Sequence, residues 1–302
     1  MQGVIHMSIH SQKVKSWLMA AFLLPTVVLS KPSDYDSWRL PYAFEFLTLR
    51  AGTGEKSLLE VFCQIPTHYL QFIKFRDGFF ASYKLSIALF DRSNKQVAKV
   101  SIVDSVKVNS FWDIDLPRPP HLIRSSFIVP SGEYEARTQI TDQETLQTLS
   151  FKRRTLIPDY SAPDLQVSDL QIASAIIPTT ENGVLVKNGR RVEPNILRLV
   201  ELGSKLPVYF EVYNLQYTPG APEEDFLLTM TIADQGGNKV KTFTKEHHKP
   251  GVTAALSVEI PLPEVAEGLY QLLVTVQDLA TSKSVQKAVN FYVVRSNIQP
   301  NI

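Results

Sequence analysis

The stretch that decides the fold occurs twice, as SGEYEARTQITDQET at residues 131–145 and as EGLYQLLVTVQDLAT at residues 267–281. Four residues are identical and align without a gap: Gly132 with Gly268, Tyr134 with Tyr270, Asp142 with Asp278, and Thr145 with Thr281. In the first copy, the residues on one face of the expected strand are mainly apolar, and the residues between them are polar. A period of two with one dry and one wet face is typical of an antiparallel strand over a core. The sequence therefore predicts a duplicated β unit.

Two more strand patterns precede this one, in the same order in both halves of the chain. Residues 83–91 (YKLSIALFD) correspond to residues 226–234 (FLLTMTIAD), and each stretch is followed by a polar turn and a valine. A shorter match relates residues 60–62 (EVF) to residues 211–213 (EVY). No stretch has a sustained helical period. The sequence therefore predicts an all-β chain with two tandem immunoglobulin-like or fibronectin-type-III-like β-sandwiches.

The N-terminal residues have the layout of a secretory signal peptide. Two lysines precede the uncharged run WLMAAFLLPTVVLS at residues 17–30, in which Val28 and Ser30 fit the small-residue preference at a cleavage site. The run is shorter than the roughly 20 residues that span a bilayer. A buried core helix or a short membrane anchor is the alternative. We expect an exported protein, periplasmic or extracellular, without a transmembrane anchor after cleavage.

The domain boundaries follow from the repeat. We expect a signal peptide at residues 1–30, a first β-sandwich at residues 31–160 and a second at residues 161–302. The junction falls at residues 157–163 (IPDYSAP), where two prolines and small residues interrupt the strand pattern.

Charge and cysteine content exclude several classes of protein. The 31 Lys and Arg residues nearly balance the 30 Asp and Glu residues, and a formal net charge of +1 argues against a nucleic-acid partner. The single cysteine, Cys63, excludes an intramolecular disulfide framework. Because it lies in the apolar run LLEVFCQIP, we expect it to be buried.

The repeated residues indicate local structure. We expect Tyr134 and Tyr270 to lie in the core with their hydroxyls bonded to backbone, like the tyrosine corner of immunoglobulin-like domains; stacking on a ligand is the alternative. We expect Asp142 and Asp278 to end their strands by capping turns. Residues 184–192 predict a hairpin with Asn-Gly at its tip.

The sequence contains no recognisable catalytic or cofactor motif. The adjacent His247 and His248 are expected in a solvated loop, and on a strand they would point to opposite faces, which disfavours a shared metal. Glu60 and Glu211 are repeat-related and could form a glycosidase pair, but we expect one in each sandwich, far apart. We therefore predict a protein that is not an enzyme, with no catalytic residue, cofactor or metal.

Aromatic clusters are the one hint of a binding site. Tyr209 and Tyr213 alternate on one face of YFEVYNLQY, and Tyr217 follows; Phe75 and Phe79 lie in HYLQFIKFRDGFF. If these rings are exposed, they could seat a protein partner or stack on a sugar. Packing within the sandwiches is the alternative.

The chain resembles the N-terminal region of GWxTD-domain proteins, which are exported bacterial proteins of unresolved function. The resemblance rests on the order of six segments: LLEVFCQIPTHYLQF, ASYKLSIALFD, PSGEYEARTQITD, LQVSDLQIA, KNGRRVEPN and LPVYFEVYNL. It covers about residues 55–295. The Gly-Trp-x-Thr-Asp motif is absent, since none of Trp17, Trp38 and Trp112 follows a glycine. The resemblance therefore covers only the tandem β-sandwich part, and it transfers no catalytic residue.

Two functions are compatible with these features. The first is a non-enzymatic interaction or scaffold protein of the bacterial cell envelope, whose partner is another envelope protein. The alternative is a carbohydrate-binding module that uses exposed aromatic residues.

Overall fold

The computed structural model describes residues 42–52, 56–66, 69–114, 121–219 and 225–295. These residues belong to one compact unit of the chain. The predicted signal peptide lies outside them. Within the described ranges, no helix has the length and apolar character needed to cross a membrane.

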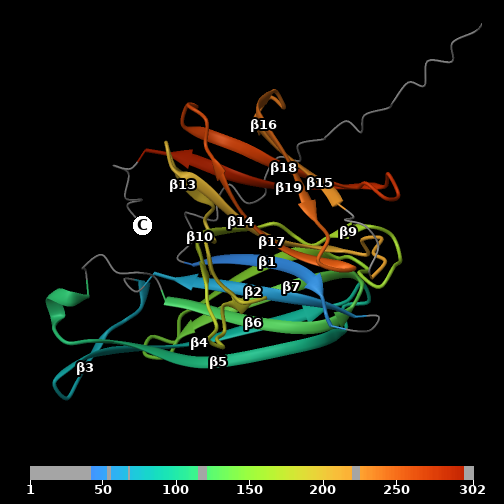
Figure 1. Cartoon of the computed structure of the whole chain (residues 1–302). Helices are drawn as coiled ribbons and strands as arrows, with labels where there is room; N and C mark the ends of the chain where they lie inside the picture. The colour runs from blue at the N-terminus through green and yellow to red at the C-terminus, as the bar shows by residue number, and fades with distance from the viewer. Residues whose placement is uncertain (1–41, 53–55, 67–68, 115–120, 220–224, 296–302) are drawn as a thin grey trace, which may run out of the picture. The chain divides into compact units, whose positions relative to one another are not determined.

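The first half of the chain forms two facing sheets, which we call the first sheet pair (Figure 1). Its strands are β1 (Ala43–Arg50), β2 (Lys56–Ile65), β3 (Ile73–Phe75), β4 (Gly78–Phe90), β5 (Gln96–Val108), β6 (His121–Pro130), β7 (Gly132–Asp142) and β8 (Thr148–Ile157). One sheet has the order β1-β2-β6; in the other, β4 pairs with β3, β5 and β7, and β7 pairs with β8. Buried residues of both sheets, among them Val61 and Leu85, form one core.

The second half forms the second sheet pair. Its strands are β9 (Gln166–Val167), β10 (Gln171–Pro178), β11 (Val186–Lys187), β12 (Arg190–Pro194), β13 (Leu199–Glu201), β14 (Lys205–Tyr213), β15 (Asp225–Asp234), β16 (Lys239–His248), β17 (Thr253–Pro261), β18 (Gly268–Asp278) and β19 (Ser284–Val294). One sheet has the order β11-β12-β10-β14-β17, with β9 beside β14, and the other has the order β13-β19-β18-β15-β16. Phe210 and Leu228 belong to the core between them.

The all-β prediction is confirmed, and the repeat is visible in the strand order. β2 lies between β1 and β6 as β14 lies between β10 and β17, and β8-β7-β4-β5 matches β19-β18-β15-β16. The Tyr134 hydroxyl donates to the Pro130 carbonyl at 3.0 Å, and the Tyr270 hydroxyl donates to the Ala266 carbonyl at 2.9 Å. The two tyrosines therefore occupy equivalent places, as predicted. The division into separate domains near residue 160 stays a prediction.

The repeated aspartates cap turns, which confirms their predicted role. Their carboxylates accept 2.9 Å bonds from backbone N–H groups of the following turns: Asp142 from Glu144 and Thr145, and Asp278 from Ala280. The second oxygen of each reaches the loop after β2 or β14, at 2.8 Å from Gln71 N and 2.7 Å from Gln216 N. Each aspartate thus ties two loops of its sheet pair together.

Two turn predictions have different outcomes. The Asn-Gly hairpin is confirmed: Asn188 and Gly189 join β11 to β12 with φ angles of +46° and +72°, as a type I′ turn requires. The solvated loop predicted for the histidine pair is wrong, because both residues end strand β16, opposite Phe226 and Asp225. Pairing with β15 extended the strand through a polar segment.

A third apolar cluster joins the two sheet pairs. It contains Ala43, Leu47, Leu49 and Phe62 from the first pair and Ala173, Val192, Ile196 and Tyr209 from the second. Alternate residues of β2 and β14 therefore point into their own core, and the remaining ones point toward the other half of the chain. Burial on both faces explains why these strands read as nearly continuous apolar runs.

Candidate functional site

Three strands extend past the end of the first sheet pair. β7 pairs with β4 only from Tyr83 onward, and β3 takes its place beside the first residues of β4. On its other edge, the same β4 segment pairs with the end of β5. A 3₁₀ turn, η3 (Phe111–Asp113), follows β5. We call this projection, residues 73–80 and 106–113, the aromatic arm.

Large aromatic rings are exposed on the aromatic arm. Phe75, Phe111 and Trp112 have exposed fractions of 53%, 57% and 82%. Ring centroids lie 5.9 Å apart for Phe75 and Phe80, 5.8 Å for Phe79 and Phe111, and 5.9 Å for Phe111 and Trp112. The rings therefore form two neighbouring groups rather than isolated contacts.

The strand register places these two groups on opposite faces of the arm. Phe80 pairs with Ile73, whose side chain shares a face with that of Phe75, whereas Phe79 pairs with Lys74. The structure thus puts the predicted Phe75 and Phe79 in one projection, on different sides. Phe79 is half-buried.

Sequence reasoning missed Phe111 and Trp112, although they are the most exposed rings of the arm. The pair lies in the polar stretch NSFWDID and belongs to no alternating pattern. The available signal was an aromatic pair flanked by Ser and Asp, which is typical of an exposed turn rather than of a core strand.

Tyr209 and Tyr213 do not meet the condition of exposed rings, because each is only 1% exposed. Their hydroxyls donate to the Glu211 carboxylate at 2.6 and 2.8 Å, and the Tyr213 hydroxyl accepts the Arg50 backbone N–H at 3.0 Å. Burial raises the pKa of both phenols. They do share one face, as predicted, but the first half of the chain covers that face. Tyr217 is half-buried in the loop after β14.

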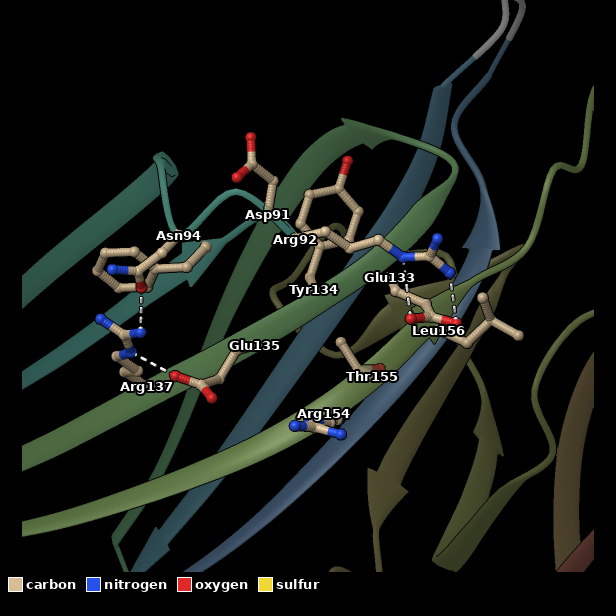
Figure 2. Close-up of a pocket in the computed structure, with 11 residues that line it drawn as sticks. Asp91, Arg92, Asn94, Glu133, Tyr134, Glu135, Arg137, Arg154, Thr155 and Leu156 are labelled. Atoms are coloured by element: carbon tan, nitrogen blue, oxygen red, sulfur yellow. Dashed lines mark hydrogen bonds and ion pairs between the residues drawn. The ribbon is translucent and has the colours of Figure 1, made fainter.

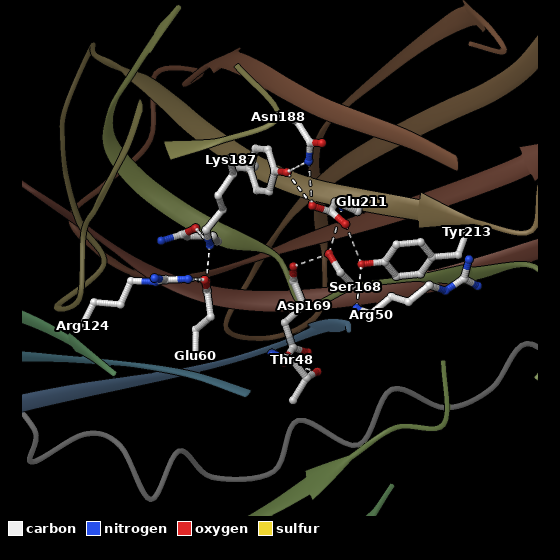
Figure 3. Close-up of polar contacts among 12 residues, drawn as sticks. Thr48, Arg50, Glu60, Arg124, Ser168, Asp169, Lys187, Asn188, Glu211 and Tyr213 are labelled. Carbon is white, nitrogen blue, oxygen red and sulfur yellow. Dashed lines mark hydrogen bonds and ion pairs between the residues drawn. The ribbon is translucent and has the colours of Figure 1, made fainter. Parts of the chain in front are cut away.

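A buried polar cluster lies beside these tyrosines (Figure 3). The Glu60 carboxylate contacts Arg124 of its own sheet and Lys187 of the β11–β12 hairpin. Asn188, the next residue of that hairpin, donates to Glu211 at 2.9 Å. Glu60 and Glu211 therefore approach the same hairpin, and the expected wide separation of the two carboxylates is wrong. Both are engaged in hydrogen bonds or ion pairs within the chain.

Further polar contacts join the two sheet pairs. The Asp169 carboxylate accepts bonds from the Thr48 backbone N–H and hydroxyl at 2.7 and 2.6 Å, and it contacts Lys287 at 2.6 Å through its other oxygen. The Arg50 guanidinium donates to the Asn214 side chain at 2.7 Å. These contacts surround the apolar cluster and fix the register between the two halves.

A surface hollow of about 660 Å³ lies between the β4–β5 turn, β7 and β8 (Figure 2). Four of its charged residues form two ion pairs: Arg92 contacts Glu133 at 2.8 Å, and Arg137 contacts Glu135. Tyr134 also lines it, but its hydroxyl is bonded to backbone. These contacts hold several of the polar side chains that line the hollow in fixed positions.

Within the described ranges, no cluster of three or more His, Cys, Asp or Glu side chains is arranged to hold a metal ion. No protein-family model matches the chain, and no curated protein sequence matches it significantly. The resemblance to GWxTD-domain proteins accordingly stays a prediction.

Proposed function

We propose that this chain is a non-enzymatic interaction or scaffold protein of the bacterial cell envelope, and that its aromatic arm contacts another envelope protein. The observation that carries the proposal is the 82% exposure of Trp112 beside the exposed Phe111. Grouped exposed aromatics mark interaction surfaces, and Trp is enriched among the residues that dominate binding energy.

The arrangement of the rings favours a protein over a carbohydrate. The Phe111 and Trp112 planes meet at 80°, and those of Phe79 and Phe111 at 64°. A sugar stacks best on an open ring face, whereas edge-to-face groups on two sides of a projection suit a partner with a shaped apolar groove. Sugar stacking on Tyr213 is disfavoured because that ring is buried.

Two features support the envelope location and the scaffold role. The signal-peptide layout of residues 1–30 and the resemblance to the N-terminal region of GWxTD-domain proteins favour export. The apolar and polar contacts between the two sheet pairs favour a fixed platform that holds the arm in one orientation.

The test is capture of partners from a bacterial envelope fraction by the tagged full chain. We expect Phe111→Ser combined with Trp112→Ser to reduce capture of a specific partner at least tenfold, roughly the loss of one hot-spot residue. Leu156→Ser is the matched control, since Leu156 is 66% exposed on β8 and lies outside the arm. Equal capture by both variants, or no specific capture by the unaltered chain, would refute the proposal. Arm-dependent binding on a glycan array without protein capture would favour the carbohydrate alternative.

A further inference from the structure

Lys187 is a buried amine surrounded by chemically complementary groups. Its side chain is 9% exposed, and its Nζ contacts Glu60 Oε2 (Figure 3). The same Nζ lies 2.8 Å from Gln171 Oε1. The rings of Phe62 and Tyr209 lie 5.4 and 5.6 Å from the same nitrogen. A nucleophile, a carboxamide and a carboxylate therefore meet in an aromatic enclosure.

The surroundings lower the pKa of Lys187 and leave the carboxamide nitrogen of Gln171 without a hydrogen bond to the described part of the chain. Burial lowers the pKa of Lys187, although the Glu60 charge opposes this shift. A desolvated lysine is an activated nucleophile. Gln171 is 1% exposed, and its Nε2 has no hydrogen-bond partner among the residues that the structure describes. Such an unsatisfied buried amide donor is costly, and loss of that nitrogen would remove the cost.

We propose that Lys187 and Gln171 join in an intramolecular isopeptide bond, with Glu60 as the proton relay. Glu60 first takes a proton from the Lys187 ammonium group, and the neutral Nζ then attacks Gln171 Cδ and forms the new C–N bond. Glu60 passes this proton to Nε2, and the Cδ–Nε2 bond breaks to release one molecule of ammonia. Glu60 then takes the remaining excess proton from Nζ and gives it to the departing ammonia, which leaves as ammonium. The carboxylate is regenerated, and no oxidant or other reactant is consumed.

The fold supplies what this reaction needs. Gln171 lies on β10 and Lys187 on the hairpin strand β11, so the folded chain holds nucleophile and electrophile together, which replaces an encounter in solution. Arg124 contacts the other oxygen of Glu60 and holds the relay in place. The product would tie the β11–β12 hairpin to β10 and strengthen the face that contacts the first sheet pair.

The test is the intact mass of the purified full chain, followed by tandem mass spectrometry of its peptides. We expect the mass to fall by one ammonia and a branched peptide to join Lys187 to Gln171. Glu60→Gln, which keeps the shape of the relay, should greatly slow the mass loss, and Lys187→Arg should abolish it. Lys245→Arg, at an exposed lysine, is the matched control and should leave the loss unchanged.

Three outcomes would overturn the proposal. An unaltered chain that keeps its full mass after prolonged incubation contains no crosslink, and this result does not depend on any variant folding. Ammonia loss that persists in Lys187→Arg would point to cyclisation at Asn188-Gly189 instead. Loss of one water, with Lys187 joined to Glu60, would show that Glu60 and not Gln171 is the acyl partner. None of these outcomes bears on partner capture by the aromatic arm.

Discussion

At the scale of single residues, Glu45 is a buried carboxylate whose charge is only partly compensated by its neighbours. It lies on β1 with 1% exposure. Its Oε1 contacts Arg198 Nε at 3.3 Å, and its Oε2 has no hydrogen-bond partner within the described part of the chain. Burial raises its pKa to about 7, although Arg198, Lys187 and Arg153 oppose this shift. Its proton is therefore bound more tightly in the folded chain than in the unfolded chain.

The sign of the pH effect follows from that difference. A raised folded-state pKa for an acid means that stability falls as pH rises from about 4.5 to about 7 and stays reduced above that range. We expect Glu45→Gln to remove this contribution and to raise the free energy of unfolding at pH 8 by roughly 1–3 kcal/mol. Denaturant titrations from pH 5 to pH 8 measure it, with Glu181→Gln at an exposed position as control. If the free energy of unfolding changes with pH in the same way in the unaltered chain and in the Glu45 variant, the raised pKa of Glu45 would be contradicted.

At the scale of elements, the aromatic arm depends on a close approach at Gly78. A Cβ added there would lie 2.6 Å from the Val108 carbonyl oxygen of β5, which is too close for any real contact. The glycine therefore lets β4 and β5 pair at the base of the β3–β4 turn, and the pairing in turn orients Phe79 toward Phe111.

Gly78→Ala should loosen the arm while the two cores stay intact. We expect a local cost of about 1–3 kcal/mol, in the range of other overpacking substitutions. Hydrogen exchange followed by mass spectrometry should show faster exchange in residues 73–80 and 106–113, with residues 268–278 in β18 as the internal control. Unchanged exchange in the arm would show that β5 accommodates the methyl group.

The elements also show where sequence prediction succeeded. The β7 and β18 patterns, their tyrosine hydroxyl bonds and their aspartate caps were predicted because each depends on residues close together in the chain. The strand containing His247 and His248 was not predicted, because its extension depends on pairing with β15. Polar segments adopt strand structure when a neighbouring strand supplies the hydrogen bonds.

At the scale of the whole molecule, the cluster between the sheet pairs couples their stability. Leu47 is 2% exposed and belongs to the same cluster as Val192 and Ile196 from the second half of the chain. Ion pairs and hydrogen bonds at Lys187 and Asp169 surround the cluster, so separating the halves would expose apolar surface and leave buried charges unpaired.

We therefore expect the chain to unfold in a single calorimetric transition. Leu47→Asp places an unpaired carboxylate in the cluster and should split unfolding into two transitions. We expect the free energy that couples the two sheet pairs to fall by roughly 3–5 kcal/mol. Leu156→Asp, at a 66% exposed position, is the control and should preserve one transition. Two transitions in the unaltered chain would mean that the sheet pairs are thermodynamically independent.

The sequence by itself determined the repeated strands, the Asn-Gly hairpin and the burial of Cys63, because alternation and turn chemistry act between residues near each other in the chain. Only the tertiary structure decided which outward faces meet water. The face of Tyr209 and Tyr213 is covered by strands more than a hundred residues earlier in the chain, and β5 brings Phe111 and Trp112 to Phe79. A period of two distinguishes the two faces of a strand, but it carries no information about what packs against either face.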